Sequence, residues 1–355
     1  MRVRCACASR ANAKALIRNI KFMKTKHLAL GVGGAVGAVV AWKLLSRAET
    51  VDWRDVSDKV VHSENSHFVE IDGATVHYQK FGDIRNPTLV LIHGFTASAY
   101  VWKTVAPELA SEGFHVVAVD LIGFGYSDKP VWFDYKITSQ ARMISRFMDR
   151  LGIGRAVIVG SSYGGAVALT LALDYSERVE KLVLVDAVIN DEPKNHPIMK
   201  LARIPGVGEV LTPFLIDSKA FMKIRMQGTL APANHHLITK DRIDSIIRPL
   251  HAKDGHNAVL QAGRNWDANR IEEDLHLINQ PTLIIWGEED TVIPIKNGET
   301  LYNSILNSRL VVLKNCGHVP MEEKSDLFVS LVSGFSHDRK GRIEAGDNEE
   351  MRFEI

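Results

Sequence analysis

Six short, continuously apolar runs constrain the fold of this chain more than any other feature. They read TLVLIHG, HVVAVDL, RAVIVGS, KLVLVDA, TLIIWG and RLVVLKN. Runs of this kind are typical of strands that are covered on both faces, as in a parallel sheet. Segments with apolar residues at helical spacing lie between them, such as SQARMISRFMDRL over residues 139–151. This alternation predicts an α/β fold in which crossover helices join parallel strands.

The remaining composition fits such a fold. Two earlier runs, HFVEI and ATVHYQKFG, read as an opening hairpin. Of the 355 residues, 46% are hydrophobic and 24% are charged, which allows a sizeable core. The formal net charge of +1 argues against a broad nucleic-acid-binding face. Only Cys316, among three cysteines, lies in the body of the chain, so no disulfide framework is expected there.

One long interval, residues 188–280, interrupts the alternation. It lacks a convincing strand and contains MKLARI, AFMKIRM, RIDSIIRPLH and NAVLQAGRNW, which read as short helices. It is either an extra helical pair or a lid over the carboxyl edge of the sheet. The chemistry on both sides of it favours the lid, which we expect as a cap within a main domain over residues 60–336. The tail over 337–355 is charged, and we expect it to be flexible.

The first fifty residues differ from the rest, because no acidic residue precedes Glu49. Within this basic segment (1–50), residues 28–45 form an apolar run that would extend roughly 27 Å as a helix. It predicts a single-pass membrane anchor, with the N-terminus in the cytoplasm because of the preceding positive charge. The alternatives left open are a removed targeting segment, giving an exported or organelle-targeted soluble enzyme, a buried helix, and a start at Met23.

The strongest local signal is the hexapeptide Gly160-Ser161-Ser162-Tyr163-Gly164-Gly165, which begins with the last two residues of the run RAVIVGS and precedes a helical pattern. A strand that turns sharply into a helix strains the backbone of its middle residue and needs small neighbours. Such a turn exposes the Ser162 hydroxyl at the edge of the sheet. Ser162 is therefore the predicted nucleophile.

A serine hydroxyl needs a base, and the base needs an orienting acid. His318 follows the last predicted strand and should lie at the same edge of the sheet as Ser162. Asp290 follows the preceding strand and is the predicted third member. Glu288 and Glu289 beside Asp290, and Asp186 at the end of KLVLVDA, remain rivals for that role. The order serine, acid, histidine is the one that this strand–turn–helix arrangement requires.

Two backbone N–H groups should hold the negative charge that develops on the substrate oxygen. Tyr163, next to the nucleophile, is predicted to supply one, and Phe95, in the loop after TLVLIHG, the other. Gly94 would let that loop approach closely. His93 is expected to support the loop and not to act in the reaction.

These motifs together resemble the α/β-hydrolase superfamily, in its esterase- and lipase-like branch with a helical cap. The resemblance spans about residues 68–335. The segments that carry it are His93-Gly94-Phe95, Asp120–Ser127 as D-x-x-G-x-G-x-S, Gly160–Gly165, Gly287–Asp290 and Gly317-His318. It implies a mostly parallel eight-stranded sheet with helices on both faces and a helical cap inserted after strand 6. It also implies that the segment Asp120–Ser127 is structural.

The same fold carries several chemistries, so the reaction must come from the site residues. Epoxide hydrolases and haloalkane dehalogenases of this family use an aspartate nucleophile, which Ser162 excludes. Carbon–carbon bond hydrolases usually have asparagine before the nucleophile and tryptophan after the histidine, where this chain has Ser161 and Val319. Haloperoxidase-like members share the whole triad. These two classes stay open as alternatives.

Ester hydrolysis through an acyl-enzyme is the predicted reaction, by a carboxylesterase or a lipase such as a monoacylglycerol lipase. It requires no cofactor and no metal, and the pair His235-His236 lacks the acid or cysteine pattern of a metal site. The expected partner is a small-molecule or lipid ester, with membrane association through residues 28–45. The aromatic and methionine residues that either line an apolar acyl pocket or form cap core are Phe95, Tyr163, Phe214, Phe221, Met222 and Trp266. A non-catalytic, membrane-tethered binding protein is the alternative from another class.

Overall fold

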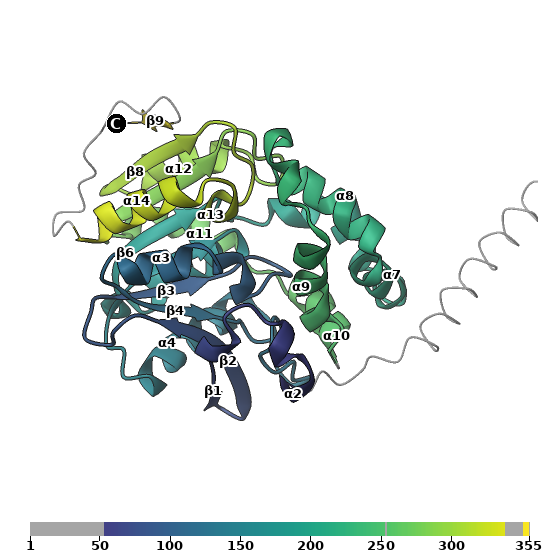
Figure 1. The fold of residues 1–355 in the computed structure, drawn as a ribbon. Coiled ribbons are helices and arrows are strands. Elements are labelled where there is room, and N and C mark those ends of the chain that lie inside the picture. Colours follow the sequence, from purple (N-terminus) through teal and green to yellow (C-terminus); the bar gives the residue numbers. More distant parts are fainter. Residues whose placement is uncertain (1–52, 253, 338–350, 355) are drawn as a thin grey trace, which may run out of the picture. The chain divides into compact units, whose positions relative to one another are not determined.

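The structure, a computed structural model of the chain, describes residues 53–252, 254–337 and 351–354. They form a nine-stranded sheet in the order β1-β2-β4-β3-β5-β6-β7-β8-β9 (Figure 1). The strands are β1 (Ser66–Ile71), β2 (Ala74–Phe81), β3 (Thr88–Ile92), β4 (His115–Val119), β5 (Ala156–Ser161), β6 (Val179–Val185), β7 (Thr282–Gly287), β8 (Ser308–Leu313) and β9 (Met351–Glu354). Neighbours from β4 to β8 pair in parallel, whereas the β1–β2, β2–β4 and β8–β9 pairs are antiparallel. The predicted mostly parallel sheet of eight strands is confirmed, and β9 extends its edge.

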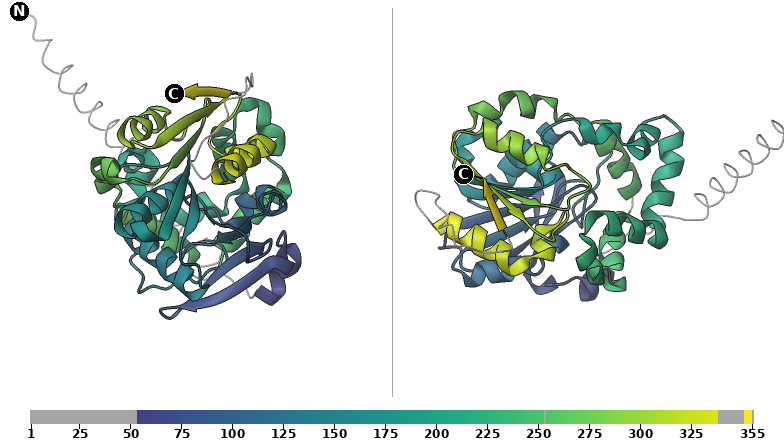
Figure 2. Two further views of the ribbon diagram at one scale, coloured as in Figure 1. Left: turned by 90° about the vertical axis from the view of Figure 1, so that its left-hand side faces the viewer. Right: turned by 90° about the horizontal axis from the view of Figure 1, so that it is seen from above.

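Helices cover both faces of the sheet, as the turned views in Figure 2 show. Leu89 and Leu91 of β3 belong to the cluster that packs under α3 and α14, whereas Val90 and Ile92 belong to the cluster under α4, α5 and α12. The bounds are α2 (Trp53–Val56), α3 (Val105–Ser111), α4 (Ile137–Arg150), α5 (Tyr163–Asp174), α12 (Lys296–Ser304), α13 (Pro320–Glu323) and α14 (Ser325–His337). Successive side chains of a strand point to opposite faces. Two covered faces therefore explain why the strand runs are apolar without alternation.

The direction in which strands are added reverses between β3 and β5. From β3 the chain passes to β4 on one side, and it then returns to place β5 on the other side of β3. In open α/β sheets, ligands bind beyond the carboxyl ends of the strands at such a reversal. The residues that follow β3 and β5 are thus placed to build a site.

Between β6 and β7 the described residues contain helices and no strand, and Figure 1 shows α7 to α10 gathered beside one end of the sheet. These helices are α6 (Pro197–Ala202), α7 (Val207–Asp217), α8 (Lys219–Thr229), α9 (Lys240–Leu250), α10 (Gly255–Arg264) and α11 (Asn269–Asp274). Short 3-10 helices complete the fold: η1 (Ser57–Lys59), η2 (Ser63–Asn65), η3 (Ala99–Trp102), η4 (Ser176–Arg178), η5 (Glu192–Asn195), η6 (Pro232–Leu237) and η7 (Leu275–Leu277). We call the segment 188–280 the cap. It has a small core of its own, where Met222 and Met226 of α8 pack against isoleucines of α9.

The prediction of a single-pass membrane location is wrong. Across residues 53–252, 254–337 and 351–354, no helix has both the length and the apolar character that crossing a bilayer requires. The predicted span, residues 28–45, itself lies outside the described residues.

The predicted flexible tail falls largely outside the described residues as well. Residues 338–350 and 355 are not described, whereas residues 351–354 form β9, which pairs with β8. Sequence reasoning missed this strand because a four-residue segment carries too little pattern to register.

Replacing Gly164 by alanine should lower the free energy of unfolding by about 1–3 kcal/mol. A Cβ at this position would lie 2.3 Å from the carbonyl oxygen of Ile92, and backbone atoms cannot rotate away. Gly334→Ala is the matched control, because Gly334 is an exposed position of α14 with no atom within 4 Å of its Cβ position. That control should gain up to about 1 kcal/mol. Urea unfolding monitored by circular dichroism measures both, and equal stability of the two variants would contradict the close approach.

Candidate active site

Ser162 lies between β5 and α5, and its backbone has a conformation that L-residues rarely adopt, with φ 54° and ψ −117°. The surrounding backbone holds it there. The Ser162 N–H donates to the Val185 carbonyl at 2.8 Å, and the Ser162 carbonyl accepts from the Val188 N–H at 3.1 Å. Strain of this kind costs about 1–3 kcal/mol and persists only where neighbours impose it. The predicted sharp turn at Ser162 is thus present in the structure.

Two glycines make the turn sterically possible. A Cβ on Gly160 would lie 2.4 Å from the carbonyl oxygen of Gly164, and one on Gly164 would meet the ends of β3. Helix α5 can therefore start directly against β3 and β5 only because these positions have no side chain. This packing aims the N-terminus of α5 at the point where Ser162 projects.

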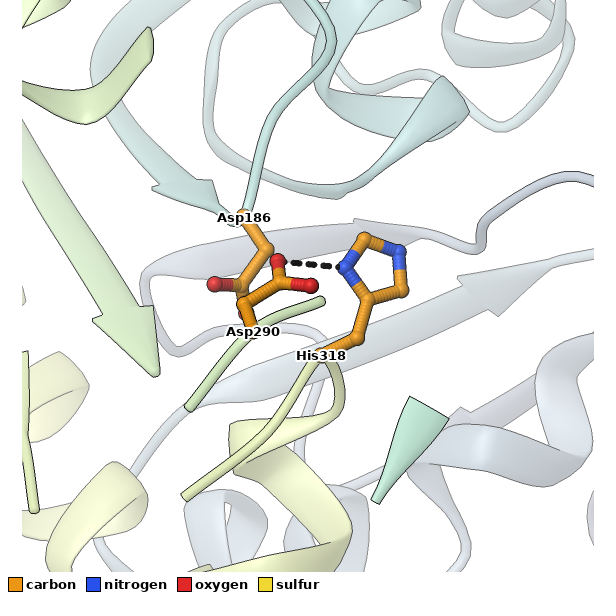
Figure 3. Close-up of side chains that lie close together, drawn as sticks. All are labelled: Asp186, Asp290 and His318. Atoms are coloured by element: carbon orange, nitrogen blue, oxygen red, sulfur yellow. Dashed lines mark hydrogen bonds and ion pairs between the residues drawn. The ribbon is translucent and has the colours of Figure 1, made fainter. Parts of the chain in front are cut away.

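His318 and Asp290 are brought together from the loops after β8 and β7. The imidazole Nδ1 donates to Asp290 Oδ2 at 2.7 Å, as Figure 3 shows. Asp290 Oδ1 accepts from the N–H groups of Val292 at 2.7 Å and Ile293 at 3.1 Å. Three bonds thus fix the orientation of a carboxylate whose side chain has no exposed surface. With Nδ1 engaged, Nε2 is the nitrogen of His318 that is left to take up a proton.

The rivals of Asp290 lie in different surroundings. Glu288 and Glu289 are exposed and make no side-chain bond to His318 in the described part of the chain. Asp186 is fully buried beside Asp290 (Figure 3). No hydrogen bond joins the Ser162 side chain to His318 among the described residues. In proteins without bound substrate, hydrogen bonds of this type are often long and shorten only in the complex.

The loop after β3 lies directly against Ser162. A Cβ on Gly94 would lie 3.2 Å from the Ser162 Cβ and 3.7 Å from its Oγ. His93 supports this loop, because its Nδ1 donates to the Gly94 carbonyl at 2.8 Å and its Nε2 accepts from the Leu121 N–H at 3.1 Å. Burial lowers the pKa of His93, which keeps the imidazole neutral as both bonds require. The contacts of His93 are therefore those of a residue that supports the loop.

The N–H groups of Phe95 and Tyr163 have no hydrogen-bond acceptor within the described residues. Phe95 follows Gly94, which lies against Ser162, and Tyr163 follows Ser162 itself. The Tyr163 N–H belongs to the first turn of α5, where backbone donors have no partner within the helix. Their position suits an oxygen supplied by a ligand.

An aromatic cluster stands beside these donors. Trp266 of the cap lies 5.1 Å from Tyr163 and 5.8 Å from Phe95 between ring centroids, and Phe124 lies 5.8 Å from Phe95. Phe95, Tyr163 and Trp266 are among the residues predicted either to line an apolar acyl pocket or to form cap core, whereas Phe124 was not among them. Of the other predicted apolar residues, Met222 belongs to the cap core and Phe214 is half exposed.

The cap is hydrogen-bonded to the loops that carry His318 and Asp290. The His318 N–H donates to the Thr229 carbonyl at 2.7 Å, and the Thr291 hydroxyl donates to the Gly228 carbonyl at 2.6 Å. Both acceptors belong to the last turn of α8. The end of α8 therefore helps to position the loop that carries His318.

Glu323 of α13 adds a second link that sequence reasoning missed. Its Oε1 accepts from the Gly317 N–H at 3.0 Å, and its Oε2 accepts from the Ala231 N–H and the Asn234 amide, each at 2.8 Å. The loop of His318 and the cap thus share one carboxylate. The only signal in the sequence was an acid five residues after the histidine, which many surface helices also show.

One group of side chains within the described residues has spacing suited to a metal. Ligand atoms of Asp186, Asp290 and His318 lie within 4.8 Å of one another. Burial and the neighbouring Asp290 raise the pKa of Asp186 well above its usual range, which favours the protonated form of this carboxyl. A protonated carboxyl is a poor metal ligand, because ligands must be deprotonated. The group therefore fits proton chemistry better than metal binding.

A buried ion cluster joins the cap to the main domain. Arg242 of α9 donates to both Glu322 oxygens at 2.8 and 3.0 Å, and Lys103 donates to one of them at 3.0 Å. Burial opposes the charge of Glu322, but these two cations hold its pKa below the usual value. The stability that this pair contributes is thus present above the ordinary glutamate pKa and is lost as the pH falls below it.

Arg242→Ala should lower the free energy of unfolding by about 3–5 kcal/mol at neutral pH, because it leaves a buried carboxylate without its main partner. The deficit should shrink toward about pH 4, where Glu322 of the variant can take up a proton. Urea unfolding at both pH values tests this. Lys103→Ala, which removes the more exposed cation, should cost less, and an equal loss for both variants would contradict the assignment.

Known proteins resemble this chain in sequence and in fold. The family described as "alpha/beta hydrolase fold" matches residues 87–219 and 244–325. An uncharacterized hydrolase, YugF of Bacillus subtilis, is 30% identical over 75% of this chain and 95% of its own length. A 2-hydroxy-6-oxo-6-phenylhexa-2,4-dienoate hydrolase of Comamonas testosteroni is 30% identical over 74% of this chain and 92% of its own.

A solved structure extends the likeness to three dimensions. Est816, described as an N-acyl homoserine lactone degrading enzyme, superposes with a TM-score of 0.62. It is 26% identical and is covered completely, with 76% of this chain included.

Proposed function

The chain belongs to the α/β-hydrolase family, and we propose that it is a serine hydrolase that cleaves carboxylic esters through an acyl-enzyme on Ser162. One observation carries the proposal: Ser162 lies in a strained turn against Gly94, and the N–H groups of the two following residues, Tyr163 and Phe95, have no acceptor among the described residues. A buried, hydrogen-bonded pair of His318 and Asp290 stands at the same edge of the sheet. These are the parts that acyl transfer requires.

In the first half of the reaction, Ser162 Oγ attacks the ester carbonyl carbon while His318 Nε2 takes the hydroxyl proton. Asp290 keeps Nδ1–H in place and stabilises the imidazolium that forms. The carbonyl oxygen becomes negative and accepts from the Phe95 and Tyr163 N–H groups. The intermediate then collapses, the bond to the alcohol oxygen breaks, and His318 gives its proton to the departing alcohol.

In the second half, a water molecule takes the place of the alcohol. His318 removes a proton from the water as the water attacks the acyl carbon. A second tetrahedral intermediate forms, and its negative oxygen accepts from the same two N–H groups. Collapse breaks the bond to Ser162 Oγ, which recovers its proton from His318. The products are a carboxylic acid and the free enzyme.

The aromatic cluster supports an apolar acyl group as the substrate class. The ring centroids of Phe95, Tyr163 and Trp266 lie within 5.9 Å of one another, and Tyr163 directly follows Ser162. Burial of each methylene of an acyl chain against such rings contributes about 0.8 kcal/mol. We therefore propose esters of medium-chain acids, with monoacylglycerols as one form of them.

A second candidate is hydrolysis of a carbon–carbon bond in a ring-cleavage product, because the relative from Comamonas testosteroni is named for such a substrate. Both reactions use the same nucleophile and base. Ser161 and Val319 stand where that class usually has asparagine and tryptophan, which favours the ester. A panel that includes a 2-hydroxy-6-oxo-dienoate beside the esters decides between them.

Ser162→Ala should abolish release of p-nitrophenol from butyrate and octanoate esters, a loss of at least about 1,000-fold in kcat, since no other group can form the acyl-enzyme. It should also abolish labelling by a fluorophosphonate probe, which reacts only with an activated serine. Ser161→Ala is the matched control and should keep both, because Ser161 is buried in β5. Full turnover by Ser162→Ala would sink the assignment, and absence of labelling in the wild type would favour a binding protein.

Gly94→Ala tests the loop that presents the Phe95 donor. The added methyl group would lie 3.2 Å from the Ser162 Cβ, so the loop must shift by a few tenths of an ångström. A displaced donor should lower kcat by roughly 10-fold to 100-fold while KM changes little, because the donor acts mainly on the transition state. Steady-state kinetics on one ester measures this. An unchanged kcat would show that the loop does not serve the oxyanion.

A further inference from the structure

Asp186 is a buried acid for which the proposed reaction has no use. It follows β6, and the structure holds it in place firmly. Its N–H donates to the Ile285 carbonyl at 3.0 Å, and its backbone has a positive φ of 44°. Asparagine, aspartate and glycine adopt such a conformation more readily than other residues. Its position beside Asp290 is therefore fixed by the backbone and does not depend on a flexible side chain.

The two oxygens of Asp186 have different surroundings. Oδ1 accepts from the Gly287 N–H at 3.0 Å, whereas Oδ2 is buried and has no donor among the described residues. An unsatisfied buried polar atom costs about 1–3 kcal/mol. Figure 3 shows the Asp186 side chain next to Asp290, which is in turn bonded to His318. A proton on Oδ2 would satisfy this atom by donating to Asp290.

The distribution of donors decides which of the two acids is ionised. Asp290 accepts from His318 and from two backbone N–H groups, whereas Asp186 accepts from one. Two adjacent carboxyls in a buried site cannot both carry a charge without a large cost. The proton that they share therefore belongs on Asp186.

We propose that Asp186 is a positioning residue that remains protonated at neutral pH and donates a hydrogen bond from its carboxyl to Asp290, completing a chain Asp186–Asp290–His318. The chain fixes the carboxylate from the side opposite to the imidazole. This proposal rests on the proposed function for the reaction that the chain serves, but the proton on Asp186 can be measured without any turnover.

The charges around Asp186 are consistent with this state. Asp290 lies in the loop after β7, His318 and Cys316 in the loop after β8, and Glu323 in α13. Burial and the negative field of Asp290 and Glu323 raise the pKa of Asp186. Burial also raises the pKa of the Cys316 thiol, so that group adds no charge near neutral pH.

Asp186→Asn and Asp186→Ala make a matched pair. The asparagine amide can donate to Asp290 and accept from Gly287, and it tolerates the positive φ, whereas alanine loses both bonds. Near pH 7 we expect Asp186→Asn to keep kcat within about threefold of the wild type. Asp186→Ala should lose about 10-fold to 100-fold in kcat with little change in KM, as is common when a residue supporting a functional side chain is removed.

Stability against pH gives a readout that does not need activity. Above the ordinary aspartate pKa the unfolded chain releases the Asp186 proton, whereas the native protein keeps it. The wild type should therefore lose stability relative to Asp186→Asn as the pH rises. The ratio of their unfolding equilibrium constants should change about tenfold per pH unit between about pH 5 and the native pKa. Urea unfolding in this range measures it.

Two results would overturn the proposal. One is a stability difference between wild type and Asp186→Asn that does not vary with pH, because the native carboxyl would then be ionised. The other is Asp186→Ala with the kcat of the wild type. If Ser162→Ala keeps its activity while the pH-dependent stability difference is present, the proposed function fails and the protonated Asp186 stands. If Asp186→Ala does not fold, the comparison of wild type with Asp186→Asn still decides.

Discussion

The close approach of α5 to the ends of β3 and β5 is the constraint on which the rest of the site depends. Gly160 and Gly164 allow it, because any side chain there would overlap backbone oxygen atoms. The approach forces Ser162 into a strained conformation, and the Val185 carbonyl secures it. Ser162 is half-buried at this turn. Packing of glycines against backbone thus sets the position of the proposed nucleophile.

The other parts of the site come from neighbouring strands that end at the same edge. The loop of Gly94 follows β3, Asp186 follows β6, Asp290 follows β7 and His318 follows β8. The parallel sheet brings these loops to one edge, and the buried surroundings strengthen each polar contact between them. The cap then adds its own bonds to the loop of His318, through the last turn of α8. A movement of the cap would therefore displace the imidazole of His318.

The sequence predicted the fold and its order of elements well, since six apolar runs without alternation leave few arrangements other than a covered parallel sheet. It also singled out Asp290 among three neighbouring acids. It failed for residues whose role depends on a distant partner. Glu323 looks like any helix acid until the cap residues Ala231 and Asn234 are seen beside it. The predicted membrane location was wrong because it rested on one apolar run, residues 28–45, and such a run does not by itself establish where a protein is located.

By itself the sequence determined the strand pattern, the strained turn at Ser162 and the types of residue available for acyl transfer, because these depend on local periodicity and on the steric needs of neighbouring residues. Only the tertiary structure decided that Asp186 lies within reach of Asp290 and His318, and that the cap shares a carboxylate with the histidine loop. Contacts between residues far apart in the chain depend on distances that packing sets to within an ångström. Spacing along the sequence does not carry that information.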